Sequence, residues 1–177
     1  MANSEYNNGV ELSKSELRKL QLIQLELLVE LDRVCRKNHI RYVMDGGTMI
    51  GAVRHHGFIP WDDDIDVAML REDYEKLKTV LSDFDSKLCF FQDHTTDPNY
   101  RWGYGKLRRV GTSYVRLGQE HLKQKDGVFI DIFPFDDVPR STFGQVVQDW
   151  YLFALRKILW SEVGRKSVGG VWRMWWT

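Results

Sequence analysis

The chain has 177 residues, of which 43% are apolar and 28% are charged, a composition typical of one compact domain rather than of a disordered or collagen-like protein. Lys and Arg number 25, as do Asp and Glu, so the net charge is zero and no overall positive field attracts a nucleic acid. The two cysteines, Cys35 and Cys89, are too few for a disulfide framework, and we expect reduced core residues.

Residues 1–12 are polar and lack the basic flank and apolar run of a secretory signal, so we expect a flexible N-terminus. No apolar stretch approaches the roughly 20 residues that cross a bilayer. These features predict a cytoplasmic location, with attachment at the inner face of the cell membrane left open.

The spacing of apolar residues predicts the secondary structure. Ser13 and Glu16 form a capping-box pattern, and the helical spacing that follows predicts a long helix from Ser13 to Lys37. The other predicted elements are strands at 41–44, 65–69, 88–91 and 128–133, helices at 49–54, 72–81 and from 141 onward, and a hairpin of 106–109 with 112–116 that turns at Gly111. This order predicts an α+β fold with a mixed, mainly antiparallel sheet and helices on one face.

The most informative segment is the acidic run that begins at Asp62. Asp64 and Asp66 are two residues apart on a predicted strand, so they point to the same face. Two such carboxylates repel each other unless a cation lies between them, and Mg²⁺ takes one or two protein carboxylates together with phosphate oxygens. The pair therefore predicts a Mg²⁺ or Mn²⁺ site, the alternative being a solvated acidic entry to the strand.

A lone carboxylate, Asp131, stands inside the apolar strand 128–133. An ionised carboxylate there would cost several kcal/mol without a partner. If this strand lies beside that of Asp64, Asp131 supplies a third ligand and can orient or deprotonate an attacking hydroxyl. The alternative is an ion pair with a buried Lys or Arg.

Three groups are candidates for binding phosphate. Gly46, Gly47 and Thr48 lie between a predicted strand and a helix, where bare N–H groups and a hydroxyl favour an anion. Arg54 and Lys106 are the basic residues that we expect to reach the same phosphates. The alternatives are a plain turn with Thr48 as the helix N-cap and solvated surface charges for the two basic residues.

The C-terminal 28 residues hold five of the seven tryptophans, which are Trp150, Trp160, Trp172, Trp175 and Trp176. A large aromatic surface needs something to bury it. We expect that the natural protein continues past Thr177, so that this chain is truncated, or that its helical end meets a partner or makes peripheral contact with a membrane.

The order of these motifs resembles that of the polymerase-beta-type nucleotidyltransferase fold. The residues within the motifs resemble those of the LicD family, which includes bacterial phosphocholine transferases and relatives of fukutin. The similarity runs roughly from Leu27 to Pro139 and rests on segments 45–48, 51–66, 97–100, 106–108 and 129–134. It implies a nucleotidyltransferase-like catalytic domain at 13–140 and a helical, Trp-rich segment at 141–177. The Tyr-Gly-Asp-Tyr-like motif typical of the family's C-terminal region is missing.

The resemblance implies a metal-dependent phosphotransferase that moves a phospho-substituent, most typically phosphocholine from CDP-choline, onto a hydroxyl of a cell-surface glycan. Such glycans include lipopolysaccharide, teichoic acid and capsule. The implied partners are a CDP-alcohol donor and a glycan or glycolipid acceptor, with no nucleic acid. By the same resemblance, the metal ligands are Asp64, Asp66 and Asp131, and the donor phosphates lie near Gly46, Gly47, Thr48, Arg54 and Lys106.

Two alternative functions use the same fold. One is a nucleotidyltransferase that moves a nucleoside monophosphate onto a sugar or small molecule. The other is a truncated, inactive scaffold that keeps the fold and binds a membrane or partner through its C-terminal segment.

Overall fold

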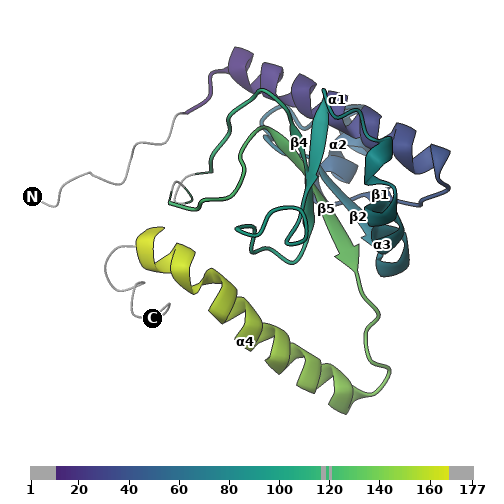
Figure 1. Ribbon diagram of the computed structural model, residues 1–177, viewed down its shortest axis with the longest axis vertical. Coiled ribbons are helices and arrows are strands. Elements are labelled where there is room, and N and C mark those ends of the chain that lie inside the picture. Colours follow the sequence, from purple (N-terminus) through teal and green to yellow (C-terminus); the bar gives the residue numbers. More distant parts are fainter. Residues whose placement is uncertain (1–10, 117–118, 120, 168–177) are drawn as a thin grey trace, which may run out of the picture. The chain divides into compact units, whose positions relative to one another are not determined.

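The computed structural model describes residues 11–116, 119 and 121–167, with side chains described as far as Ile158. The chain divides into two units (Figure 1). The first comprises the described part of residues 1–114 with 124–135, and the second comprises the described part of 115–123 with 136–177. Most of the predicted flexible segment 1–12 and the three last tryptophans lie outside the described residues. The predicted division into 1–12, 13–140 and 141–177 stays a prediction.

The long N-terminal helix is confirmed. Helix α1 spans Lys14–Lys37 with Ser13 as its N-cap. The Ser13 hydroxyl accepts a bond from the Glu16 N–H, and the Glu16 carboxylate accepts one from the Ser13 N–H. These two bonds satisfy donors that the helix itself leaves without partners, which explains why the helix begins here.

Five strands form one mixed sheet in the order β1-β2-β5-β4-β3. Their bounds are β1 Val43–Met44, β2 Asp66–Leu70, β3 Cys89–Gln92, β4 Gly105–Arg109 and β5 Phe129–Phe135. Strands β2 and β5 run parallel, and the other three neighbouring pairs run antiparallel. The predicted α+β fold with a mixed sheet is therefore confirmed.

Three shorter helical segments complete the first unit, namely α2 Gly46–His55, α3 Arg71–Thr79 and a 3-10 helix at Leu81–Asp83. Helix α2 begins three residues earlier than predicted, because Asp45 is its N-cap. Both glycines of the predicted turn therefore belong to the first turn of the helix. The strand predicted at 41–44 is correspondingly shorter, since only its last two residues pair with β2.

The predicted hairpin of 106–109 with 112–116 is wrong. Strand β4 pairs with β3 along one edge and with β5 along the other, so residues 112–116 find no open edge of β4 to pair with. The chain turns at Gly111, which has a φ of +75°, and the Thr112 hydroxyl then accepts a bond from the N–H of Val128, the residue before β5.

The two faces of the sheet differ in character. Alternate residues of β2, β4 and β5 pack with buried residues of α1 and α3 in one hydrophobic core, and they are Val67, Met69, Leu107, Ile130 and Ile132. Successive residues of a strand point to opposite faces. Asp66, Lys106 and Asp131 therefore lie on the face away from that core. Helices α1 and α3 share one face, as predicted, and the polar residues gather on the other.

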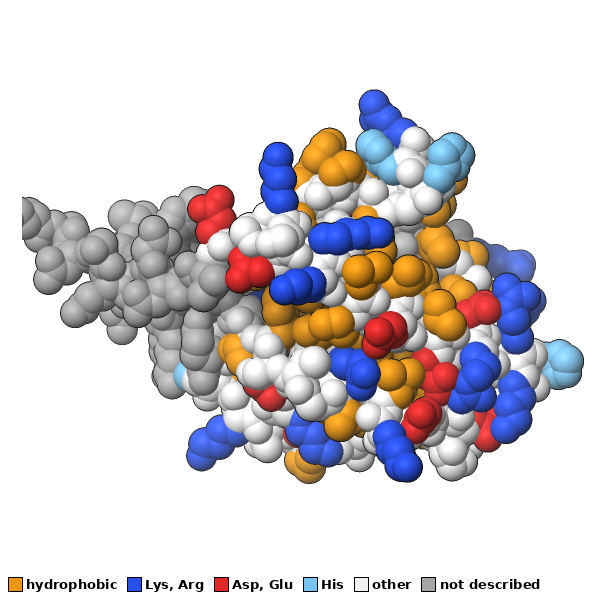
Figure 2. Space-filling view, turned by 90° about the horizontal axis from the view of Figure 1, so that it is seen from above, with side chains coloured by type: hydrophobic (Ala, Val, Ile, Leu, Met, Phe, Trp, Pro, Cys, Tyr) orange, Lys and Arg blue, Asp and Glu red, His pale blue; other side chains and the backbone are white. Residues whose placement is uncertain are grey.

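The face of the molecule seen in Figure 2 mixes polar and apolar groups. Figure 2 shows acidic and basic side chains interspersed with exposed hydrophobic ones. On α1 the exposed hydrophobic residues are Leu22, Leu25 and Val29. This mixture fits a chain whose positive and negative charges cancel.

The second unit contains helix α4, Thr142–Ser167. Its exposed large hydrophobic residues are Phe143, Val146, Val147, Trp150, Tyr151, Leu152, Phe153, Leu155 and Ile158. Within the described part of the chain, no helix is long and apolar enough to cross a membrane. Contact of this segment with a membrane surface or a partner stays a prediction.

Candidate active site

The first turn of α2 lies directly against two carboxylates. Gly46 has a φ of +50°, a left-handed conformation that favours glycine. A Cβ atom at Gly47 would lie 2.6 Å from Oδ2 of Asp62, and one at Gly46 would lie 3.8 Å from Oδ2 of Asp66. The two glycines therefore let the helix N-terminus approach the carboxylates, and its partial positive charge favours the negative charge there.

The acidic loop before β2 gathers three carboxylates. One carboxylate oxygen from each of Asp62, Asp63 and Asp64 lies within 4.8 Å of the others. Burial and the charges of Asp64 and Asp63 raise the pKa of the Asp62 carboxyl above its ordinary value of 3.8. Crowded hard oxygen atoms of this kind are the ligand type that Mg²⁺ and Mn²⁺ prefer, so the residues present fit the predicted metal.

The observed group differs in membership from the predicted one. Among the described residues, Asp62, Asp63 and Asp64 form the group of three carboxylates that could hold one ion. Asp66 and Asp131 are not part of that group of three, and their role as metal ligands together with Asp64 stays a prediction. Asp64 belongs to both sets. The difference has a simple cause, because β2 begins only at Asp66, so residues 62–64 lie in a loop and do not alternate as a strand would.

Asp66 and Asp131 lie side by side on the sheet. They are register partners in the parallel pair β2 and β5, and the Asp131 N–H donates to the Ile65 carbonyl at 2.9 Å. On its other side Asp131 is the register partner of Lys106 in β4. A row of charged residues, Asp66, Asp131 and Lys106, thus crosses three adjacent strands of the sheet.

Lys106 forms an ion pair with Asp131, and each side chain is only 4% exposed. The ammonium nitrogen also lies 3.5 Å from the centroid of the Phe129 ring and 5.2 Å from that of Tyr104. Aromatic faces stabilise a desolvated cation. The structure therefore shows the ion pair with a buried Lys that is the alternative interpretation of Asp131, and the contact of Lys106 with a donor phosphate stays a prediction.

Thr48 and Arg54 occupy opposite ends of α2. The Thr48 hydroxyl accepts a bond from the Asp66 N–H at 2.8 Å, which ties α2 to β2. The N-cap is Asp45, so the alternative of Thr48 as N-cap is wrong, and a hydroxyl that accepts one bond can still donate its proton. Arg54 is exposed in the last turn, about 12 Å along the axis from Gly46 at 1.5 Å per residue.

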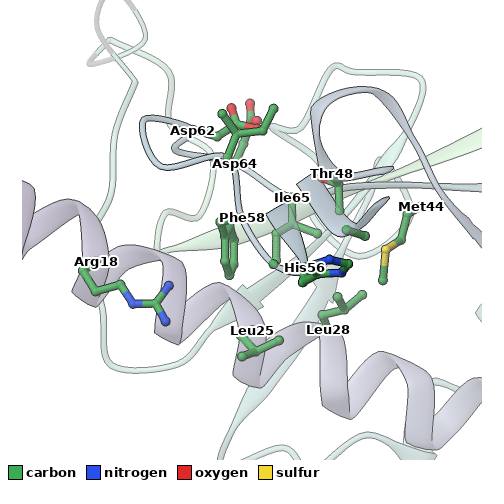
Figure 3. Close-up of a pocket in the computed structure, with 13 residues that line it drawn as sticks. Arg18, Leu25, Leu28, Met44, Thr48, His56, Phe58, Asp62, Asp64 and Ile65 are labelled. Carbon is green, nitrogen blue, oxygen red and sulfur yellow. The ribbon is translucent and has the colours of Figure 1, made fainter. Parts of the chain in front are cut away.

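A cavity of about 470 Å³ adjoins the acidic loop. Asp62, Asp64 and Thr48 line it, and Figure 3 shows the two aspartates close together at one end. The remaining lining residues come from α1, β1, α2 and the loop before β2, and they are Arg18, Leu25, Leu28, Met44, Ala52, His56, Gly57, Phe58, Ile59 and Ile65. A cavity lined mainly by apolar residues, with a few polar or charged groups such as Asp62, Asp64, Arg18 and His56, is typical of a small-molecule site.

Two buried residues of α1 that the sequence analysis did not single out contact the acidic loop. The Gln21 amide donates to the Asp62 carbonyl at 2.9 Å, and the Gln24 amide donates to the Asp63 carbonyl at 2.8 Å. The sequence contains a signal for them, because both glutamines stand on the mainly apolar buried stripe of α1. A polar residue on such a stripe needs a hydrogen-bond partner.

Comparison with known proteins gives the family. Residues 39–159 match the family described as LicD/FKTN/FKRP, nucleotidyltransferase domain. The chain belongs to the LicD family. The matched range includes the first turn of α2, the acidic loop, Lys106 and Asp131, whereas α1 precedes it.

Three relatives show how far the likeness to LicD-family proteins extends. The chain is 34% identical over 130 residues to the lipopolysaccharide cholinephosphotransferase LicD of Haemophilus influenzae, which covers 73% of this chain and 48% of that protein. It is 40% identical over 135 residues to the uncharacterized protein RT0683 of Rickettsia typhi, which covers 73% of this chain and 37% of that protein. It is 47% identical over 34 residues to the human ribitol 5-phosphate transferase FKRP, which covers 19% of this chain and 7% of that protein. The chain thus spans half or less of the length of these relatives.

Proposed function

We propose that this chain carries the donor-binding and catalytic part of a metal-dependent phosphotransferase. The reaction would move a phospho-substituent, phosphocholine from CDP-choline, onto a hydroxyl of a cell-surface glycan or glycolipid. The observation that carries the proposal is the meeting of a glycine-rich helix N-terminus with the carboxylates of Asp62 and Asp66 in a chain similar to a lipopolysaccharide cholinephosphotransferase.

The charges around the first turn of α2 support binding of a diphosphate together with a cation. The helix N-terminus attracts phosphate oxygens, but the neighbouring carboxylates of Asp62, Asp64 and Asp66 would repel them. A divalent cation between carboxylate and phosphate oxygens removes this conflict. We propose that Asp64 holds the ion together with Asp66 and Asp62, and that Gly46, Gly47 and Thr48 contact the donor phosphates.

Asp131 is the group we assign to the acceptor. Its carboxylate is held by Lys106, next to Asp66 in the sheet, so it is placed to accept the proton of an attacking hydroxyl. The acceptor oxygen would form a bond to the phosphorus that bears choline, the bond from that phosphorus to CMP would break, and CMP would leave. When bound, the metal ion supplies charge neutralisation for the phosphates and the leaving group.

The cavity beside Asp62 and Asp64 supports the binding of an organic group next to the phosphates. Asp62 and Asp64 lie together at its polar end (Figure 3), and Thr48 also lines it. These are the residues assigned to the ion and the phosphates. Its apolar part is large enough for the alcohol portion of a small donor molecule. We propose that this portion occupies the cavity while the diphosphate stays at the polar end.

The experiment is product analysis with the purified chain. The chain is incubated with Mn²⁺ or Mg²⁺ and either CDP-choline or CTP, with and without a hydroxyl acceptor, and the products are identified by phosphorus NMR. Phosphotransfer predicts CMP from CDP-choline, formed by slow hydrolysis even without an acceptor. Nucleotidyl transfer predicts pyrophosphate from CTP.

The matched variants are Asp64→Asn and Asp126→Asn. Asp126 is an exposed carboxylate that accepts a bond from the Ser113 hydroxyl and lies outside the acidic cluster. CMP formation that depends on the metal and is lost only in Asp64→Asn would support the proposal. Pyrophosphate from CTP would replace it with nucleotidyl transfer, and the absence of both products would favour the scaffold.

A further inference from the structure

Two buried glutamines of α1, Gln21 and Gln24, are bound to the backbone of the acidic loop. Their side chains belong to residues only 3% and 2% exposed. Gln21 donates through Nε2 to the carbonyls of Asp62 and Ile59, at 2.9 and 3.4 Å. Gln24 donates through Nε2 to the carbonyl of Asp63 at 2.8 Å. Helix α1 thus contacts two of the three residues that carry the crowded carboxylates.

The orientation of both amides is settled by their partners. Carbonyl oxygens only accept hydrogen bonds, so the NH₂ group of each glutamine must face the loop. The Oε1 atom of Gln21 in turn accepts a bond from Nη1 of Arg18 at 3.1 Å. The Gln24 amide also reaches the carbonyl of Phe129 at 3.3 Å, two residues before Asp131, and so connects the acidic loop to β5.

We infer that Gln21 and Gln24 are positioning residues that hold the acidic loop in the geometry that binds the divalent cation. The loop has no strand partners of its own at residues 62–64, and its three carboxylates repel one another. Without a tether, the loop would relax by moving the carboxylates apart. Two hydrogen bonds to the backbone oppose this relaxation without using any carboxylate oxygen. The inference rests on the proposed metal site and extends it to a helix that precedes the matched family range.

The test measures Mn²⁺ binding directly, by the electron paramagnetic resonance of free Mn²⁺, in the purified chain. The variants are Gln21→Met and Gln24→Met, which keep the side-chain length and remove the amide. Loss of a residue that orients metal ligands typically weakens metal binding about 10-fold to 100-fold. We expect that loss in each variant, and a larger one in the double variant.

The matched control is Glu30→Met on the same helix. Glu30 is buried and accepts a bond from the Asp85 N–H at 2.8 Å, so it ties α1 to a loop that carries none of the acidic cluster. We expect Glu30→Met to lower the melting temperature and to leave Mn²⁺ affinity unchanged. Equal Mn²⁺ affinity in wild type, Gln21→Met and Gln24→Met would overturn the inference while leaving the metal site standing.

Hydrogen exchange of the metal-free chain gives a second readout that does not depend on the ion. Amides of residues 59–64 are expected to exchange faster in Gln24→Met than in wild type or Glu30→Met. Unchanged exchange in that segment would overturn the inference. Absence of Mn²⁺ binding in the wild type would overturn the proposed metal site and this inference with it, an outcome distinct from equal binding by all variants.

Discussion

The acidic loop and the β4–β5 pair place carboxylates in opposite electrostatic surroundings. At Asp62 to Asp64, three carboxylates crowd together, and the pKa of Asp62 is raised by burial and by its neighbours. At Asp131, one deeply buried carboxylate has an ammonium group from the same chain as its partner. The chain thus supplies the cation for one part of the site, and we propose that an ion from solution supplies it for the other part.

The first test removes the ammonium group that pairs with Asp131. In Lys106→Met, Asp131 is left as a buried carboxylate without its ammonium partner, and removing one member of a buried pair costs about 3–5 kcal/mol of unfolding free energy. Urea denaturation of the metal-free chain measures this. The double variant Lys106→Met with Asp131→Asn removes both charges and is expected to recover most of the loss. A single variant as stable as wild type would show that the pair does not neutralise Asp131.

The second test displaces the Asp62 side chain while keeping the charges of the three crowded carboxylates in place. In Gly47→Ala, the new Cβ would lie 2.6 Å from Oδ2 of Asp62, so that side chain must move. A ligand or reacting group displaced by about 1 Å can cost about 10²-fold in rate. We expect CMP formation from CDP-choline to fall by about that factor with a small change in melting temperature. Gly103→Ala is the control, because its Cβ would meet nothing within 4 Å, and equal activity of both variants would contradict the close approach.

The smallest expected effect comes from removing the charge of Asp62, which relieves the repulsion among the carboxylates of Asp62, Asp63 and Asp64. Folding raises the pKa of the Asp62 carboxyl above its ordinary value of 3.8. At a pH between 3.8 and the pKa of the folded chain, the folded chain therefore binds more protons than the unfolded chain, and the free energy of unfolding falls as the pH rises. Asp62→Asn removes this penalty. In the presence of EDTA we expect the variant to be more stable at pH 7 by about 0.5 kcal/mol, and the difference to vanish below pH 3.8. A variant less stable at pH 7 would contradict the crowding.

The sequence predicted the parts of the site that depend on local patterns. The capping box at Ser13, the α+β order and the acidic run at Asp62 follow from spacing and composition alone. The membership of the carboxylate cluster did not follow, because it depends on where β2 begins. The partner of Asp131 did not follow either, since it depends on the register of β4 against β5.

The false hairpin and the two glutamines show the same limit. Residues 112–116 have the local pattern of a strand, but β4 has neighbours on both edges, a fact that only the assembled sheet contains. Gln21 and Gln24 are polar interruptions of an apolar stripe, which signals a buried hydrogen bond. Their partners lie about 40 residues away in the chain, so the stripe alone does not identify them.

The most direct test of the central claim is isothermal titration of the chain with CDP-choline in the presence and absence of Mn²⁺, repeated on Asp64→Asn. The claim is that the crowded carboxylates and the first turn of α2 form one site for a cation and a diphosphate. We expect binding that requires Mn²⁺ and is lost in the variant. Binding of equal strength without Mn²⁺, or in Asp64→Asn, would contradict it.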